Sequence, residues 1–105
     1  MTGTHIIMLS EAFGRVAADG SAALAFRRQK IDRHLLVSER IVIDFTGVRS
    51  ANSSFMNALL TGLFEDNGEV LLSKFVFKGC NPTVRVLVES AIHLGLCKHE
   101  ERQRA

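Results

Sequence analysis

The chain has 105 residues, of which 47% are hydrophobic and 23% are charged, and it carries a formal net charge of +2. This length fits one small domain over residues 1–105, and the composition is globular rather than disordered. The small net charge does not indicate a nucleic-acid partner, and the apolar run at residues 6–9 is too short for a signal peptide or a membrane span. Two cysteines make no disulfide framework, so we expect a cytoplasmic protein with reduced thiols.

The first half of the chain predicts two strands separated by a helix. Residues 5–9 form a β-prone apolar run, whereas residues 13–16 fit either a short strand or a turn. Asp19 is a suitable N-cap for a helix that ends near residue 36. Residues 40–45 are almost continuously apolar, which is typical of a strand in a sheet with both faces covered.

The second half repeats this alternation. Residues 74–78 alternate polar and apolar side chains and predict a strand. Asn81 and Pro82 predict a helix start, Gly95 is the natural residue to end that helix, and residues 96–105 read as a frayed charged tail. Strands that alternate with helices favour an α/β fold with a small, mainly parallel sheet and crossover helices. We expect these residues to carry the core: Ile41, Ile43, Phe45, Leu59, Leu63, Val76 and Leu87.

The most informative segment joins the strand at 40–45 to an amphipathic helix expected at 53–65. Asp44 is more simply read as a strand-end residue that bonds a turn amide than as a catalytic base. A polar cluster at residues 50–54 then delivers two adjacent serines to the helix start, where unpaired N–H groups suit an anion or a phosphorylated side chain. Capping by Asn52 would also explain this cluster, and the two interpretations are compatible.

The segment VIDFTGVRSANSSFMNALL resembles the core motif of STAS domains, the fold of anti-sigma-factor antagonists. In that motif a strand ending in Asp is followed by a turn Val and by Asp-Ser-Ser-Gly at a helix start. Here the turn Val is Val48, and the four motif positions are Asn52, Ser53, Ser54 and Phe55. The whole chain is closer to the small STAS-like domains of unknown function, in which Ser-Ser-Phe replaces Ser-Ser-Gly. The resemblance implies a STAS-like fold and a non-enzymatic signalling or interaction module.

The resemblance also implies a modification site and a protein partner. The first serine of the motif is phosphorylated in STAS antagonists by a kinase of the histidine-kinase-like ATPase class, which makes Ser53 the expected phospho-acceptor. The expected partner is such an ATPase or an anti-sigma factor, docked on the helix at 53–65 with Asn52, Ser54 and Phe55 at the contact. Phe55 stands where the parent motif has Gly, and it points about 100° away from Met56 of the buried stripe on a helix. It therefore fits either the edge of the core or an exposed apolar anchor.

The alternative function is a binding module for a small anionic ligand or a nucleotide. Its site would lie between two helix starts, with Ser53, Ser54 and Asn81 presenting hydroxyl, amide and N–H groups. An enzyme is not expected, because the sequence offers no paired carboxylates and no Ser–His pair at a useful spacing, and no catalytic residue is assigned.

Histidine and cysteine residues raise the question of a metal site. His93, Cys97 and His99 lie close in sequence, but their spacing is not a regular zinc spacing, so we expect no metal and no cofactor. Cys80 precedes a predicted helix start, a position that can lower the pKa of a thiol.

Overall fold

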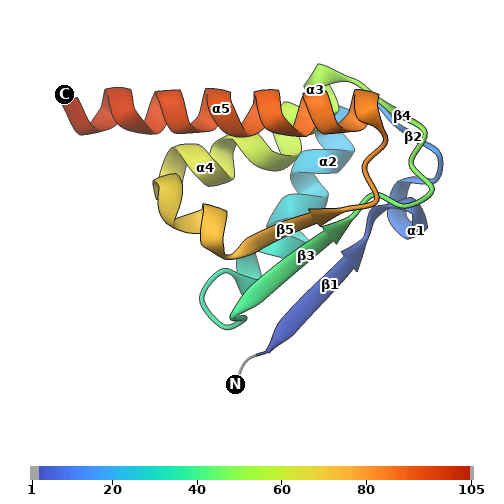
Figure 1. Cartoon of the computed structure of the whole chain (residues 1–105), viewed down its shortest axis with the longest axis horizontal. Helices are drawn as coiled ribbons and strands as arrows, with labels where there is room; N and C mark the ends of the chain where they lie inside the picture. The colour runs from blue at the N-terminus through green and yellow to red at the C-terminus, as the bar shows by residue number, and fades with distance from the viewer. Residues whose placement is uncertain (1–2, 105) are drawn as a thin grey trace.

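The computed structural model of this protein describes residues 3–104, and its strands and helices follow the predicted order (Figure 1). The strands are β1 (Thr4–Met8), β2 (Val16–Ala17), β3 (Arg40–Asp44), β4 (Ser50–Ala51) and β5 (Phe75–Lys78). The helices are α1 (Leu9–Phe13), α2 (Gly20–Phe26), α3 (Ser53–Met56), α4 (Gly62–Asn67) and α5 (Pro82–Arg104). Four short helical segments of π or 3-10 winding join them: η1 (Arg27–Ile31), η2 (Asp32–His34), η3 (Asn57–Thr61) and η4 (Gly68–Ser73).

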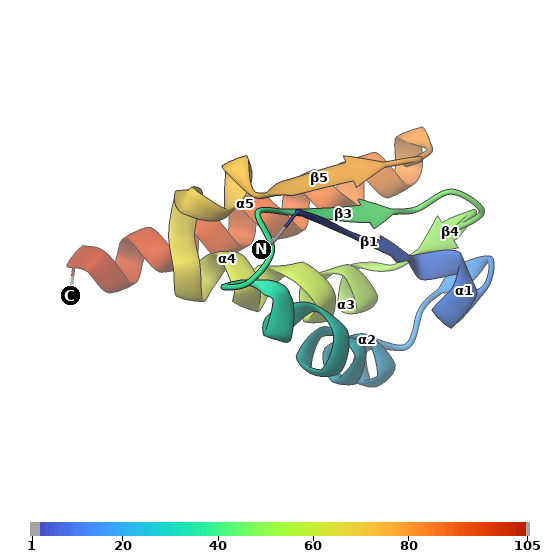
Figure 2. The same cartoon turned by 90° about the horizontal axis from the view of Figure 1, so that it is seen from below.

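Three parallel strands form the main sheet in the order β1-β3-β5, with β3 at the centre. Both crossovers therefore move in the same direction across the sheet, and right-handed crossovers then place their helices on the same face. Figures 1 and 2 show α2, α3, α4 and α5 on that one face, with the other face free of helices. The α/β prediction is confirmed, whereas the expectation of two covered faces is wrong.

The apolar run in β3 led to the wrong expectation of two covered faces, because β3 is shielded on the open face by its neighbouring strands. Val42 points to this face, yet it is only 8% exposed, because its neighbours in register are Ile6 on β1 and Val76 on β5. A central strand can therefore be apolar on both sides without a second helical layer. The short pair of β2 and β4 is parallel and lies beyond the carboxyl ends of the main strands (Figure 1).

The core lies between the covered face of the sheet and the helices. Five of the seven predicted core residues are at most 1% exposed, namely Ile41, Ile43, Phe45, Leu59 and Leu63. Of the other two, Val76 was predicted wrongly, because it is half-buried on the open face, whereas Leu87 is partly buried and packs against the edge of the core. The position of Val76 follows from the alternation of side chains along a strand. Val76 pairs with Val42, which points to the open face, and not with Ile41, which points into the core.

The central helix runs without interruption through α3, η3 and α4, and we use this name for residues 53–67. It packs against α2 on one side and α5 on the other (Figures 1 and 2). Its apolar surface is therefore wider than one stripe, and Phe55, Met56, Leu60 and Phe64 are all fully buried. A helix buried on several sides can offer only its ends as a docking surface.

The prediction that the last helix ends at Gly95 is wrong, because α5 continues to Arg104. Gly95 has a packing role instead. An ideal Cβ built on it would lie 2.5 Å from the Thr61 carbonyl oxygen and 2.9 Å from the Phe64 Cβ. The missing side chain lets α5 approach the central helix closely, where the Thr61 hydroxyl donates to the Ala91 carbonyl over 3.1 Å.

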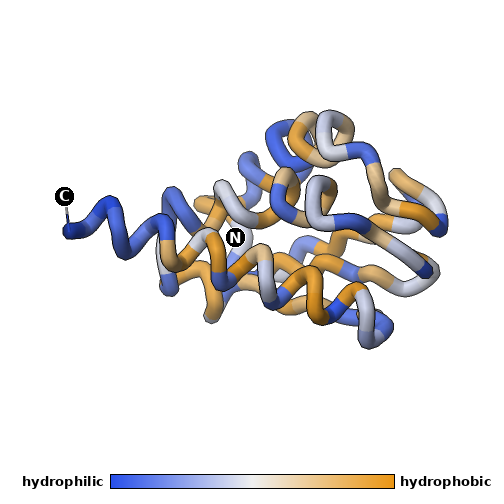
Figure 3. Tube along the Cα trace, turned by 90° about the horizontal axis from the view of Figure 1, so that it is seen from above, coloured by the Kyte–Doolittle hydropathy of each residue, from blue (hydrophilic) through white to orange (hydrophobic). Residues whose placement is uncertain are grey.

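Residues 96–104, expected to be a frayed charged tail, form the last turns of α5. Arg102 joins this segment to the central helix through a 3.0 Å contact with Asp66. The final turns are hydrophilic and project beyond the rest of the molecule (Figure 3). Among the described residues, no helix combines the length and the apolar character needed to cross a membrane.

Candidate functional site

The candidate site is the start of α3, where β4 leads directly into the helix. The Asn52 Oδ1 accepts the backbone N–H of Phe55 over 2.8 Å, which confirms Asn52 as the N-cap. The Asn52 Nδ2 donates to the Ala18 carbonyl over 3.1 Å, and the Asn52 backbone N–H donates to the Ala17 carbonyl. Both ends of this amide are thus held within the fold, so Asn52 orients the helix start.

The two serines differ in their surroundings, although both are exposed. Ser54 lies against the start of α2, since an ideal Cβ on Gly20 would be 2.7 Å from the Ser54 Oγ and 3.2 Å from its carbonyl oxygen. No hydrogen bond within residues 3–104 engages the Ser53 hydroxyl. Ser53 is therefore the less hindered of the two hydroxyls.

The start of α2 lies beside the start of α3. The sequence predicted the Asp19 cap of this helix but not its position next to Ser54. Asp19 caps α2 by accepting the Ala22 N–H over 3.1 Å, and Gly20 then packs directly on Ser54. The positive ends of two helix dipoles therefore meet at this corner. The available signal was Gly20 directly after the Asp19 cap, because a glycine there permits close contact with another backbone.

Phe55 is fully buried, so the hypothesis of an exposed apolar anchor is wrong. Its ring makes an edge-to-face contact with Phe13 of α1 at a centroid distance of 4.8 Å and an interplanar angle of 88°. Phe13 in turn contacts Phe26 of α2 at 5.2 Å. The residue after the two serines thus joins three helices in the core.

The carboxyl ends of β3 and β5 lie side by side, since Asp44 pairs with Lys78. Asp44 accepts the Thr46 N–H over 2.9 Å, as expected for a strand-end residue that closes a turn. Hydrogen bonds from the Thr46 side chain and backbone lower the pKa of the Asp44 carboxyl, and the charge of Lys78 adds to this shift. Gly79, at a φ of +69°, passes so close that its ideal Cβ would lie 2.6 Å from the Thr46 nitrogen.

The third helix start, at α5, is also capped by asparagine. The Asn81 Oδ1 accepts the Val84 N–H over 2.8 Å, and its Nδ2 donates to the Arg49 carbonyl over 2.9 Å. Pro82 has no N–H to offer a ligand. The three surface cavities that we describe in residues 3–104 are lined by residues other than Ser53, Ser54 and Asn81.

The cysteines and histidines are dispersed. Burial raises the pKa of the Cys80 thiol, so the expected lowering is wrong for this residue. Cys97 lies 3.5 Å from the Nε2 of His93, whereas His99 contacts the Glu65 carbonyl through its Nδ1 over 2.8 Å. Over residues 3–104 no three His, Cys, Asp or Glu side chains are grouped as a metal site would require.

Comparison with known proteins gave one match. The model of the family described as a STAS-like domain of unknown function (DUF4325) matches residues 23–85. The match spans the chain from α2 to the first turn of α5, and it includes the Asn52 cap and both serines. No curated protein and no solved structure matched the chain. Since the family model covers more than half of the sequence, the chain belongs to this STAS-like family.

Proposed function

We propose that this domain is a non-enzymatic, cytoplasmic signalling module that docks a protein partner at the start of α3 and is regulated by phosphorylation of Ser53. The expected partner is a histidine-kinase-like ATPase or an anti-sigma factor, in line with the STAS resemblance. Because most of the central helix is buried, the docking surface is its first turn, with Ser53 and Ser54 held in place by the Asn52 cap.

One observation carries this proposal: Ser53 combines an exposed hydroxyl, free of hydrogen bonds within residues 3–104, with a rigid position. A kinase needs such access, and a partner surface needs such rigidity. The Ser54 hydroxyl is exposed but more hindered, because Gly20 lies against it, and Asn52 lacks the freedom because both ends of its amide are bonded.

The electrostatics of the helix start favour the modified form. A phosphoserine carries about −1.5 to −2 charges at pH 7 and tends to stabilise a helix N-terminus. The backbone N–H groups of Ser53 and Ser54 precede the first intrahelical bond, in which Met56 donates to Asn52, so they are free to meet those charges. Phosphorylation is therefore expected to preserve the fold while it reverses the local surface charge.

The experiment compares binding by charge variants at the two serines. The probe is a purified histidine-kinase-like ATPase or anti-sigma factor from the source organism, and binding is measured by calorimetry. We expect Ser53→Glu to weaken or strengthen binding by at least about tenfold, or about 1.4 kcal/mol. The matched control, Ser54→Glu, and the neutral Ser53→Ala should both have smaller effects. Equal effects of the two Glu variants, with unchanged thermal unfolding, would contradict a specific role for Ser53.

A further inference from the structure

The free edge of β5 is the strongest feature that the proposed function leaves unused. In a parallel ladder, alternate residues direct their backbone groups to the same neighbour. Lys74 and Lys78 accept hydrogen bonds from Ile41 and Phe45, on the β3 side of the strand. Phe75 and Phe77 therefore direct their N–H and C=O groups away from β3, and no loop or helix within residues 3–104 bonds these groups.

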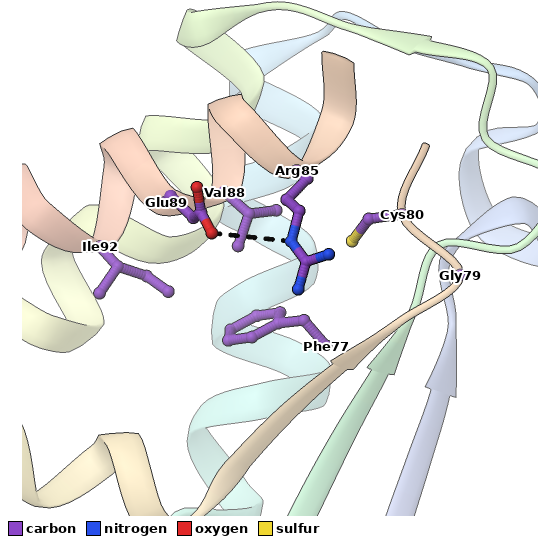
Figure 4. Close-up of a pocket in the computed structure, with 7 residues that line it drawn as sticks. All are labelled: Phe77, Gly79, Cys80, Arg85, Val88, Glu89 and Ile92. Carbon is purple, nitrogen blue, oxygen red and sulfur yellow. Dashed lines mark ion pairs between the residues drawn. The ribbon is translucent and has the colours of Figure 1, made fainter. Parts of the chain in front are cut away.

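A groove lies at the carboxyl end of this free edge. One wall is Phe77 of β5 with Gly79 and Cys80 of the loop that follows, the other wall is the first half of α5, and the cavity between them, open to solvent, measures about 330 Å³ (Figure 4). α5 packs on α3, η3 and α4 and extends past the edge of the sheet (Figure 1). Val88 and Ile92 thus face the space where a fourth strand would lie.

The floor of the groove is apolar, and its solvent-exposed rim is polar. Phe77, Val88 and Ile92 supply the apolar surface, and an ion pair between Arg85 and Glu89 borders it on the α5 side (Figure 4). The two partners of this 3.6 Å pair are 72% and 68% exposed, so moving them aside costs little.

We propose that this groove binds an extended segment of a partner protein, which adds as a fourth strand to the free edge of β5. The backbone of the guest would bond the outward groups of Phe77, as in other proteins that recognise peptides by strand addition. Strand side chains alternate between faces, and Phe77 points to the covered face. The guest residue opposite Phe77 therefore meets Val88 and Ile92 and is apolar, while its two neighbours lie on the open face beside Val76 and Lys78, where contact with solvent favours polar residues.

The test begins with amide hydrogen exchange on the ¹⁵N-labelled full chain. In the free protein the Phe77 N–H should exchange at least about tenfold faster than the Val76 N–H, which the β3 ladder protects. Short linear peptides are then selected for binding from a displayed random library. We expect the enriched peptides to alternate apolar and polar residues and to slow exchange at Phe77 while exchange at Val76 stays unchanged.

Two variants locate the binding site. Ile92→Glu places a charge in the groove and should weaken peptide binding at least about tenfold. The control is Val86→Glu, on the same helix but 61% exposed, which should leave binding unchanged. A second measurement leaves the groove itself unchanged. Cys97→Ser removes the other thiol, so that alkylation reports on Cys80 alone, and a bound peptide should slow alkylation of Cys80 at the end of the groove.

Several results would overturn the proposal. These are slow exchange at Phe77 in the free protein, enriched peptides without the alternating pattern, or peptides that leave Phe77 exchange and Cys80 alkylation unchanged. Protection of Phe77 that rises with protein concentration alone would show that the edge is covered by a second copy of the chain instead.

Discussion

Two helix starts in this protein look alike and differ in what they leave available. Asn52 begins α3 and Asn81 begins α5, and each asparagine accepts an N–H three residues later over 2.8 Å while its amide donates to a distant loop carbonyl. At α3 the cap is followed by two exposed serines, whose backbone N–H groups make no hydrogen bond within residues 3–104. At α5 Pro82 removes one N–H and one hydroxyl position, and Thr83 supplies the one exposed hydroxyl of that first turn among the described residues.

The comparison shows that a capping motif alone does not identify a functional site. Both asparagines are the kind of polar residue that a sequence reading assigns to a ligand, and in both the amide is bonded at both ends. The useful distinction is what remains unbonded at the first helical position after the cap. At α3 that position is Ser53, whose exposed hydroxyl is unengaged among the described residues, whereas at α5 it is Pro82 and an exposed, unbonded hydroxyl comes only with Thr83, one residue further on.

The largest expected effect concerns the third residue after each cap, since Phe55 and Val84 are both fully buried. Phe55→Ala should lower the free energy of unfolding by about 3–5 kcal/mol, because it removes an aromatic ring from the contact with Phe13. Urea denaturation measures this loss. If Phe55→Ala keeps its stability but loses partner binding, Phe55 is part of the docking surface, and its assignment to the core is wrong.

The next effect concerns the strand-end junction that leads to the α5 start. Gly79→Ala should cost about 1–3 kcal/mol, because the added Cβ meets the Thr46 backbone in a tight site. Gly14→Ala is the matched control, since Gly14 has a similar φ of +73° but nothing within 4 Å of an ideal Cβ. Equal thermal destabilisation by the two variants would show that backbone conformation alone, without the contact to Thr46, accounts for the effect.

The Asn52 and Asn81 caps should contribute similar amounts to the free energy of unfolding. Asn52→Ala and Asn81→Ala are each expected to cost about 0.5–2 kcal/mol in urea denaturation, the usual range for an N-cap. Asn52→Asp, which restores the carboxylate of the STAS motif, should retain the cap. If Asn52→Ala costs less than about 0.5 kcal/mol, the level of ordinary surface changes, the cap at α3 is not holding the helix start.

The smallest effect is on the acid limb of stability. The pKa of Asp44 is lowered in the folded protein by hydrogen bonds from Thr46, so the unfolded chain binds more protons as the pH falls through the range of this carboxyl. Stability from this group is present above its ordinary pKa and is lost on acidification. Asp44→Asn keeps an acceptor for the Thr46 N–H but cannot titrate, and it should flatten the fall in melting temperature below about pH 4. An unchanged acid limb would exclude this role for Asp44.

The local signals in the sequence predicted much of the fold. Caps at Asp19, Asn52 and Asn81 depend on residues within one turn of each other, and the structure places each where the sequence indicated. The strand order and the open sheet face depend on crossover geometry, which no local pattern records. Gly95 was misread for the same reason, because its role is a contact with Thr61 from a distant part of the chain.

The candidate site was predictable in part. The position of Ser53 at a helix start follows from the Asn52 cap, but the difference between Ser53 and Ser54 comes from Gly20, which is distant in sequence. The burial of Phe55 could not be read from a single apolar stripe, because the central helix packs on both α2 and α5. The groove beside β5 needs the strand order and the path of α5, and neither is visible in the sequence.

Mapping the phosphate by mass spectrometry tests the central claim most directly. The intact chain and its Ser53→Ala and Ser54→Ala variants are incubated with ATP and a histidine-kinase-like ATPase from the source organism that binds the domain. The proposed role predicts phosphate on Ser53 in the intact chain and in Ser54→Ala, and none in Ser53→Ala. Phosphate on Ser54 or elsewhere, or no phosphate with an ATPase that demonstrably binds the domain, would contradict the assignment of Ser53 as the regulated residue.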